Sequence, residues 1–215
     1  MRPAIVCLPI ASLLVSVAAA QTPAPGAAPP ARAVEYASYH VPMFSNDYVT
    51  VLNVFIPSKR ESGYHRHSLD SIAVLMSDST RTNQTLGAEP IARPLQPRGT
   101  VSFTPYASGP LVHTVAVQGD PPFHNIVVEL LDAKPSGFSP GTRGQPYTVV
   151  LDNERARVWR LVLEPGQTAA AITQAAPGVR VVVDGGELYW QEAGGTRAVR
   201  NVGTTRIELV EIELK

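Results

Sequence analysis

Cysteine is nearly absent from this sequence of 215 residues, in which Cys7 is the sole example. Cys7 lies inside an apolar N-terminal stretch that we expect to be removed from the mature protein. The mature chain would then contain no disulfide and no thiol chemistry. Its stability must come from the burial of apolar surface and from hydrogen bonding.

An excess of either charge is also missing, because 18 Lys and Arg residues balance 18 Asp and Glu residues. Without a basic stripe, nucleic acid is excluded as an expected partner, and an anionic membrane surface is not favoured. No glycine-rich phosphate loop stands between a strand and a helix, so a nucleotide cofactor is not implied. No nucleophile elbow is present either, which argues against an α/β-hydrolase.

Sustained helical periodicity is the third absence, although 44% of the residues are hydrophobic. The apolar segments are short, rich in β-branched and aromatic residues, and bounded by proline, glycine and asparagine, as in strands. We expect strands over 47–56, 71–76, 100–103, 113–117 and 123–131. The sequence therefore predicts an all-β protein with little helix.

The N-terminus has the pattern of a secretory signal peptide. Arg2 supplies a positive charge, the stretch from Ile5 to Val17 is almost wholly apolar, and small residues precede Gln21. We expect a signal peptide over 1–20, cleaved near Ala20, and a secreted or periplasmic protein. The alternative is an uncleaved N-terminal anchor. Without that anchor, no membrane partner is expected after cleavage.

The rest of the chain divides into two similar halves. A Pro/Ala-rich flexible linker over 21–35 precedes an N-terminal domain over 36–133, and a Pro/Gly/Ser-rich linker over 134–145 precedes a C-terminal domain over 146–215. The Asn46-Asp47 turn, a strand and Pro57 recur as Asn153-Glu154, a strand and Pro165. Duplication of a β unit is the favoured reading, with coincidence among β-rich segments as the alternative. The second half is shorter by about two strands of chain.

Two histidines, His65 and His67, stand one residue apart at the start of a predicted strand. Side chains alternate along a strand with a period of two, so both imidazoles should point to the same face. His113 begins another strand downstream. Three neutral imidazoles from neighbouring strands are a common way to hold one divalent transition metal with coordination positions left open. Fe, Mn, Zn, Ni and Cu all suit this ligand type.

Other polar side chains have less definite roles. Asp70 is either a fourth, oxygen ligand reached through a bulge, or a turn residue or hydrogen-bond acceptor that orients an imidazole. His124 follows a Pro-Pro turn and could point inward, and His40 precedes the barrel as a surface or packing residue. Four glutamates alternate with apolar residues and are expected to face solvent: Glu129, Glu208, Glu211 and Glu213.

The histidine pattern resembles the motifs of the cupin superfamily. His65 and His67 fit the paired histidines of its first motif, and His113 fits the histidine of its second, preceded by Gly99, Pro105 and Gly109 in the expected order. The family glutamate would fall at Ser71 or Ile72, so Asp70 is the nearest carboxylate. The resemblance implies a duplicated, antiparallel double-sheet jelly-roll barrel with the metal ligands His65, His67, Asp70 and His113.

In the second half the candidate ligands are replaced. Aligned on the proline and the following strand, His65 and His67 correspond to Thr173 and Ala175, and Asp70 falls near Gly178. Aligned on the last pair of strands, His113 corresponds to Arg197. The resemblance therefore implies a second, degenerate cupin without metal ligands.

The resemblance does not determine the activity, because the superfamily includes oxygenases, isomerases, decarboxylases, storage proteins and sugar sensors. We therefore consider two main hypotheses for the function. The first is an exported metal-dependent oxygenase or isomerase that acts on a small oxygenated molecule. The second is an exported module that binds a metal or a small ligand without turnover. A purely structural barrel is the third and weakest idea. A homodimer is possible, since exposed strand edges in jelly rolls often pair.

Overall fold

The computed structural model describes residues 31–137 and 141–215. The predicted signal peptide lies outside these residues, as does the predicted linker up to residue 30. Residues 31–35 of that linker are described, and they lead into the first barrel with Val34 buried in its core. Within the described residues, no helix is long and apolar enough to cross a membrane.

The described residues form strands and a single short 3₁₀ turn, which confirms the prediction of an all-β fold. The elements are β1 Arg32–Ala33, η1 Val34–Tyr36, β2 His40–Ser45, β3 Val49–Ile56, β4 His65–His67, β5 Ser71–Leu75, β6 Arg81–Thr85, β7 Ile91–Arg93, β8 Val101–Thr104, β9 Leu111–Val117, β10 Phe123–Leu130, β11 Tyr147–Asp152, β12 Ala156–Leu163, β13 Thr168–Thr173, β14 Gly178–Val182, β15 Leu188–Gln191, β16 Thr196–Arg200 and β17 Ile207–Leu214.

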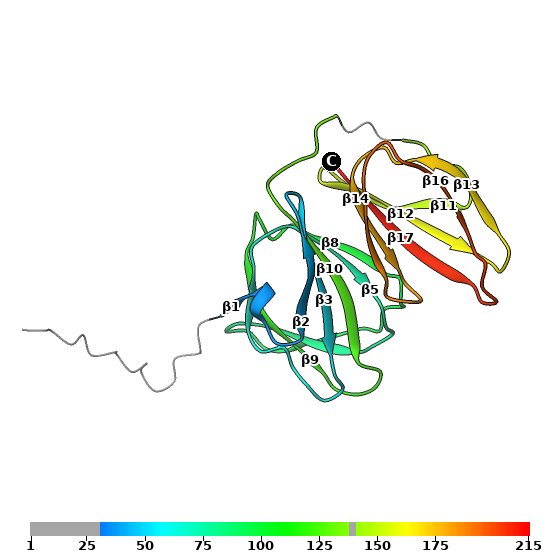
Figure 1. Cartoon of the computed structure of the whole chain (residues 1–215). Coiled ribbons are helices and arrows are strands. Elements are labelled where there is room, and N and C mark those ends of the chain that lie inside the picture. The colour runs from blue at the N-terminus through cyan, green and yellow to red at the C-terminus, as the bar shows by residue number, and fades with distance from the viewer. Residues whose placement is uncertain (1–30, 138–140) are drawn as a thin grey trace, which may run out of the picture. The chain divides into compact units, whose positions relative to one another are not determined.

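These strands make two jelly-roll barrels in succession, drawn from blue to green and from yellow to red in Figure 1. In the N-terminal barrel, the sheet β2-β3-β10-β5-β8 faces the sheet β1-β4-β9-β6-β7. In the C-terminal barrel, the sheet β11-β12-β17-β14-β15 accompanies the pair β13-β16. Pairing is antiparallel throughout the described strands except between β1 and β4. This arrangement is the duplicated jelly roll that the sequence predicts.

The two barrels correspond strand by strand, except for the short β1 and one insertion in the N-terminal barrel. The order β2-β3-β10-β5-β8 is repeated as β11-β12-β17-β14-β15. The N-terminal barrel inserts β6 and β7 between β5 and β8, whereas β15 follows β14 directly. The missing chain in the second half is therefore this hairpin, in agreement with the expected loss of about two strands.

A large apolar cluster joins one sheet of each barrel. It contains Val51, Ile72 and Val128 from the N-terminal barrel, and Val158 and Ile212 from the C-terminal barrel. Residues at alternate positions on the same strands face the barrel interiors instead, where each barrel has a core cluster of its own. The central strands β10 and β17 are consequently buried on both faces.

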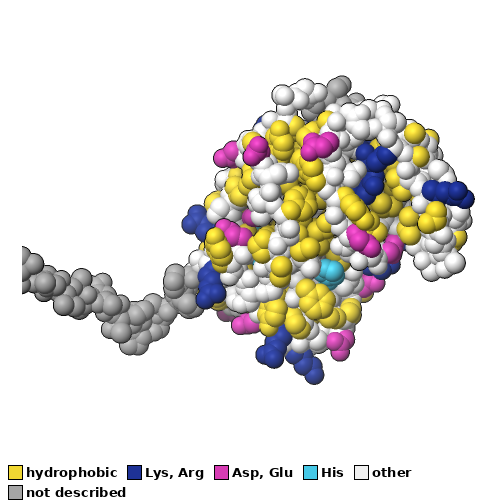
Figure 2. All heavy atoms as spheres, viewed as in Figure 1, with side chains coloured by type: hydrophobic (Ala, Val, Ile, Leu, Met, Phe, Trp, Pro, Cys, Tyr) yellow, Lys and Arg dark blue, Asp and Glu magenta, His cyan; other side chains and the backbone are white. Residues whose placement is uncertain are grey.

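The burial of both faces overturns the expectation that the alternating glutamates face solvent. Glu129, Glu208, Glu211 and Glu213 are between 1% and 8% exposed. Alternation of apolar and charged residues normally indicates a strand with one face exposed to solvent. Here neither face is exposed, because one face lines a barrel interior and the other packs against the second barrel. On the face of the molecule shown in Figure 2, charged side chains of both signs are scattered among apolar ones.

The interior of the C-terminal barrel is filled by ion pairs. Arg143, from the segment predicted to be a linker, bonds to Glu211 at 2.5 Å and to Glu213 at 2.6 Å. Arg180 and Arg197 also pair with Glu211. Burial raises the pKa of Glu211, but the three arginines lower it by more, so the carboxylate stays ionised.

The matching position in the N-terminal barrel has no such compensation. On the two neighbouring strands, Glu129 lies opposite Thr50 and Ser71. In the C-terminal barrel, Glu213 lies opposite Arg157 and Gly178 at the matching positions of the corresponding strands. The two glutamates therefore occupy equivalent sites. Among the described residues, Glu129 forms no ion pair. Burial, with a contribution from the negative charge of Glu35, raises the pKa of Glu129 to about 7.

Replacing Arg143 by methionine should destabilise the protein by about 3–5 kcal/mol, because it leaves two buried carboxylates without their shared cation. Urea denaturation measures the change in the free energy of unfolding. The control is Arg98→Met, which breaks an exposed ion pair with Asp184 and should cost under about 1 kcal/mol. Equal losses in the two variants would contradict the structural role of Arg143.

The stability of the wild type should fall by roughly 2 kcal/mol, relative to Glu129→Gln, as the pH rises from about 4.5 to about 7. The folded state keeps the Glu129 proton across this interval, while the unfolded chain releases it. The stability that depends on the protonated carboxyl is thus fully present at low pH. It is lost as the pH rises through the pKa of Glu129 in the folded state. Denaturation curves of both proteins at several pH values measure the difference, and parallel pH profiles would argue against the prediction.

Candidate metal centre

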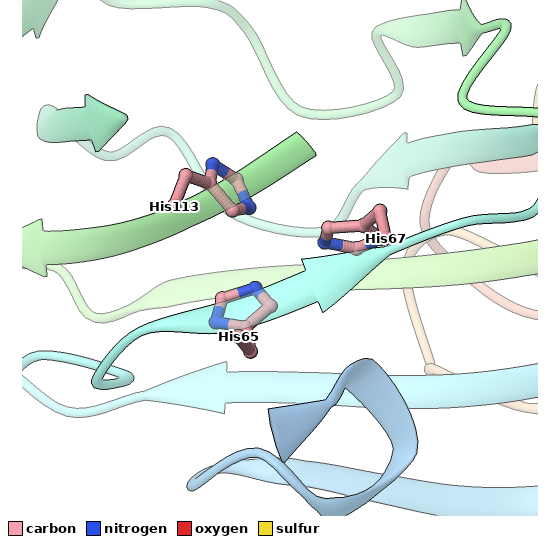
Figure 3. Close-up of side chains that lie close together, drawn as sticks. All are labelled: His65, His67 and His113. Carbon is pink, nitrogen blue, oxygen red and sulfur yellow. The ribbon is translucent and has the colours of Figure 1, made fainter. Parts of the chain in front are cut away.

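Pairing between β4 and β9 brings the three predicted histidines together. His65 lies directly opposite His113 in the antiparallel register, and His67 is two residues further along β4. His65 and His67 are buried, while Arg66 between them is exposed, as the period of two predicts. Figure 3 shows the three imidazoles, from these two neighbouring strands, turned toward a common space.

The spacing of the rings fits a shared ion. The ring centroids of His65 and His113 are 4.7 Å apart, and those of His67 lie 5.1 Å from each of the other two. One ligand nitrogen can be chosen from each ring such that all three lie within 4.8 Å of one another. A transition ion about 2 Å from each imidazole nitrogen holds the nitrogens about 4 Å or less apart, so a small inward movement of the rings would complete the site.

Each ring also has a buried nitrogen without a hydrogen-bond partner: His65 Nε2, His67 Nδ1 and His113 Nε2. On His65 the other nitrogen is engaged, since Nδ1 donates to the carbonyl oxygen of Gly63 at 2.9 Å. That bond fixes the proton on Nδ1 and leaves the Nε2 lone pair free, which is the usual arrangement of a metal-binding histidine. Buried polar atoms rarely lack partners, so the donor set fits a bound metal.

The surroundings keep the imidazoles neutral. Burial, assisted by the charges of neighbouring groups, lowers the pKa of His65 to about 3, of His67 to about 2 and of His113 to about 4. Metal binding requires the neutral ring, because only the unprotonated nitrogen has a lone pair to donate. The site is therefore in the ligand-ready protonation state at neutral pH.

Asp70 does not join this cluster. Its carboxylate accepts from the Arg155 guanidinium at 3.0 Å and from the backbone N–H of Ala107 at 3.0 Å. Arg155 also donates to the carbonyl oxygen of Leu131, so Asp70 lies at the junction between the N-terminal barrel and the turn before β12. Of the four predicted ligands, Asp70 is therefore the one that lies apart from the imidazoles. Its carboxylate instead pairs with Arg155.

The other two described histidines have different positions. His124 points away from the cluster and bonds to Asn53 Oδ1 at 2.8 Å. His40 was expected at the surface or in packing, and it is buried with its ring 4.7 Å from that of His65. Its Nδ1 donates to the Ser38 carbonyl oxygen. Sequence reasoning missed this neighbour because His40 and His65 lie on strands of two different sheets, and only the facing of those sheets brings the rings together.

A cavity of about 480 Å³ opens beside the imidazoles. Its walls include apolar side chains such as Val54, Ile56 and Val127. Tyr106 also lines it and stacks on His67, with the ring centroids 4.6 Å apart. Two arginines, Arg81 and Arg93, also line it, whereas no Asp or Glu does among the described residues. The volume is sufficient for a small organic molecule in contact with the metal position.

The second barrel has no counterpart to this site within the described residues. Arg197 lies opposite Ile172 in the register of β13 and β16, just as His113 lies opposite His65 in the register of β4 and β9. The guanidinium of Arg197 donates to Glu211 at 2.8 Å. The register thus places Ile172, one residue before Thr173, at the position that matches His65. Ion pairs occupy the interior where the first barrel has its imidazoles and cavity.

Comparison with solved structures identifies the architecture. AerE from Microcystis aeruginosa matches at 10% identity, covering 84% of this chain and 99% of its own, with a TM-score of 0.56. Oxalate decarboxylase from Bacillus subtilis matches at 10% identity over 78% of this chain and 68% of its own, with a TM-score of 0.51. A cupin domain from Bordetella pertussis covers 47% of this chain and 96% of its own at 23% identity and a TM-score of 0.39.

This chain has the cupin fold. The conclusion agrees with the histidine motif, and at these identities it concerns the fold alone. No protein-family model and no curated protein sequence matches the chain. Within the cupin fold, the first barrel carries the three-histidine cluster and the second does not.

Alanine at His65, His67 or His113 should lower metal affinity on the order of a hundredfold or more, since each change removes one of three ligands. Metal per chain after dialysis, measured by plasma mass spectrometry, should fall from about one toward zero in each variant. The matched control is Asp70→Asn, which breaks the contact with Arg155 and should retain the metal. Loss of metal from a folded Asp70→Asn protein would show that the carboxylate is a ligand.

Proposed function

We propose that the N-terminal barrel is a metal-dependent enzyme of the oxygenase or isomerase class that acts on a small oxygenated molecule. The observation that carries the proposal is the position of the cluster. Three buried imidazoles, each with an unpaired ring nitrogen, stand in the wall of an internal cavity. A purely structural site would normally be closed by a fourth protein ligand, and no described Asp, Glu or Cys joins these three.

The residues of the chain have distinct tasks in this proposal. His65, His67 and His113 would hold a divalent Fe, Mn, Zn, Ni or Cu ion, and the Gly63 carbonyl orients His65. When bound, the ion would supply Lewis-acid or redox chemistry to a coordinated oxygen atom of the substrate. Tyr106 restrains His67 by stacking, and apolar side chains cover part of the cavity wall.

A second candidate function is a metal- or ligand-binding module without turnover. One observation favours it: among the described residues, no carboxylate lines the cavity. Proton abstraction from a substrate usually requires a positioned base, and carboxylates are among the common ones. The one cavity imidazole outside the cluster is that of His40, whose Nδ1 donates to a backbone carbonyl and whose Nε2 is the remaining candidate base.

The proposal includes export and does not require self-association. The predicted signal peptide over 1–20 supports a secreted or periplasmic location, and it lies outside the described residues. A homodimer stays a prediction. Determining the N-terminal residue of the mature protein from a bacterial host would test cleavage near Ala20 directly.

Catalysis should appear when the purified chain, loaded separately with Fe(II), Mn(II), Zn(II), Ni(II) or Cu(II), is incubated with phenols, diketones and sugar acids. Dioxygen uptake and mass spectrometry of the products measure oxygenation and isomerisation. His67→Ala should abolish any turnover, whereas Asp70→Asn should retain it. If the loaded protein binds these compounds tightly and converts none, the binding module is the correct function.

A further inference from the structure

The two arginines of the cavity lie on the hairpin that only the metal-bearing barrel contains. Arg81 on β6 is the direct cross-strand partner of Arg93 on β7. Like charges directly opposite each other on a sheet are destabilising. The equivalent connection in the C-terminal barrel runs from β14 to β15 without a hairpin. The sequence therefore maintains an unfavourable pair of cations at one place in the protein, the wall of this cavity.

Arg81 is half-buried and Arg93 is exposed. Neither arginine has a carboxylate partner among the described residues, where every ion pair involves other side chains. Arg81 bonds to Gln96 through Nη2 at 3.1 Å, and its guanidinium lies 4.8 Å from the centre of the Phe123 ring. Its Nη1 is buried without any hydrogen-bond partner. Burial, with a contribution from Arg93, lowers the pKa of Arg81, which reports the cost of holding this charge there.

The C-terminal barrel shows how this fold treats buried arginines when no ligand is needed. Arg143, Arg180 and Arg197 are neutralised by Glu211 and Glu213. In the N-terminal barrel the counter-charge is missing, and a bound metal ion would add further positive charge to the same cavity. Arg81, half-buried and with an unpaired Nη1, therefore lacks a counter-charge that an anion entering from outside would supply, with exposed Arg93 beside it.

We infer that the cavity binds a small organic carboxylate, with Arg81 and Arg93 holding the carboxylate group and the three-histidine centre facing the rest of the molecule. The planar guanidinium forks of arginine match a carboxylate in a bidentate manner. The inference deepens the proposed function by naming its substrate class, and it rests on that function for the role of the metal. Asn83 and Asn125 line the same cavity with unpaired Oδ1 atoms, which suit a hydroxyl donor on the ligand.

The position of the hairpin supports a role in selecting the ligand. Arg93 and His113 line the same cavity. Arg81 lies opposite Val117 on β9, four residues beyond His113, and Arg93 is directly beside Arg81 on β7. The two arginines therefore stand together at one level of the sheet, separated from the metal position along β9, as is needed to hold one end of an elongated acid whose other end faces the metal.

The test is isothermal titration calorimetry of the purified chain, metal-loaded and metal-free, with matched probes. The probes are 2-hydroxybenzoate against 2-hydroxybenzamide, glycolate against glycolamide, and inorganic phosphate. In each pair we expect the carboxylate to bind about tenfold or more tightly than its uncharged amide, because charge-assisted hydrogen bonds are the stronger ones. Inorganic phosphate should bind more weakly than the better carboxylate, and equal or tighter phosphate binding would overturn the assignment to carboxylates.

The variants locate the preference. Arg81→Gln and Arg93→Gln should each reduce the ratio of carboxylate to amide affinity by about tenfold, and Arg81→Lys should retain part of it. Arg66→Gln, which removes an exposed positive charge from β4, is the matched control and should leave the ratio unchanged. A ratio that persists in folded Arg81→Gln and Arg93→Gln proteins would overturn the inference.

The metal-free arm separates this inference from the proposed function. If the purified wild-type chain takes up no metal but still binds carboxylates more tightly than amides, the metal-dependent function is refuted and the anion site is supported. A metal-loaded protein that prefers no carboxylate would refute the anion site and leave the metal centre standing.

Discussion

The apolar contact between one sheet of each barrel is the constraint on which the remaining structure depends. Val51, Ile72 and Val128 meet Val158 and Ile212 in one buried cluster, so the largest apolar cluster of the described residues lies outside the barrels, between them. Burial of this kind is the dominant stabilising term in folding. Because each barrel need not rely on its interior alone for stability, the interiors are free to hold polar groups, imidazoles in one and ion pairs in the other.

Duplication then allowed two different uses of one framework. Glu129 and Glu213 occupy equivalent positions, but Arg143 neutralises only the second. A buried carboxylate with cations nearby stays ionised, whereas one without them is shifted toward its protonated form. The C-terminal barrel thereby gains a filled, charge-balanced interior. The N-terminal barrel keeps a cavity with unpaired nitrogen donors and two unneutralised arginines.

The sequence was sufficient for those features that depend on local periodicity. The spacing of His65 and His67 predicts a shared face because a strand alternates its side chains, and the burial of both with Arg66 exposed confirms it. His113 required more, since only the β4–β9 register places it opposite His65. The motif order of the cupin resemblance substituted for that missing register, which is why the whole cluster could be named in advance.

Features decided by packing between distant segments were not accessible in the same way. The alternating glutamates of β17 were assigned to solvent because the pattern does not reveal that a second barrel covers the outer face. Asp70 is close to the histidines in sequence, yet Arg155, far away in the chain, determines where its carboxylate points. His40 reaches the site from the opposite sheet, across the barrel interior. In each case the deciding partner lies beyond the range of any local pattern.

The distribution of chemistry over the strands has a physical logic. The three histidines lie on β4 and β9, which pair directly with each other, and rigid elements hold a metal geometry better than loops do. The two arginines lie on β6 and β7, a hairpin bonded to the rest of its sheet through β9 alone. Variation in this hairpin can change which molecule the cavity accepts without moving a ligand. The C-terminal barrel, which lacks the hairpin, shows that the fold tolerates its complete removal.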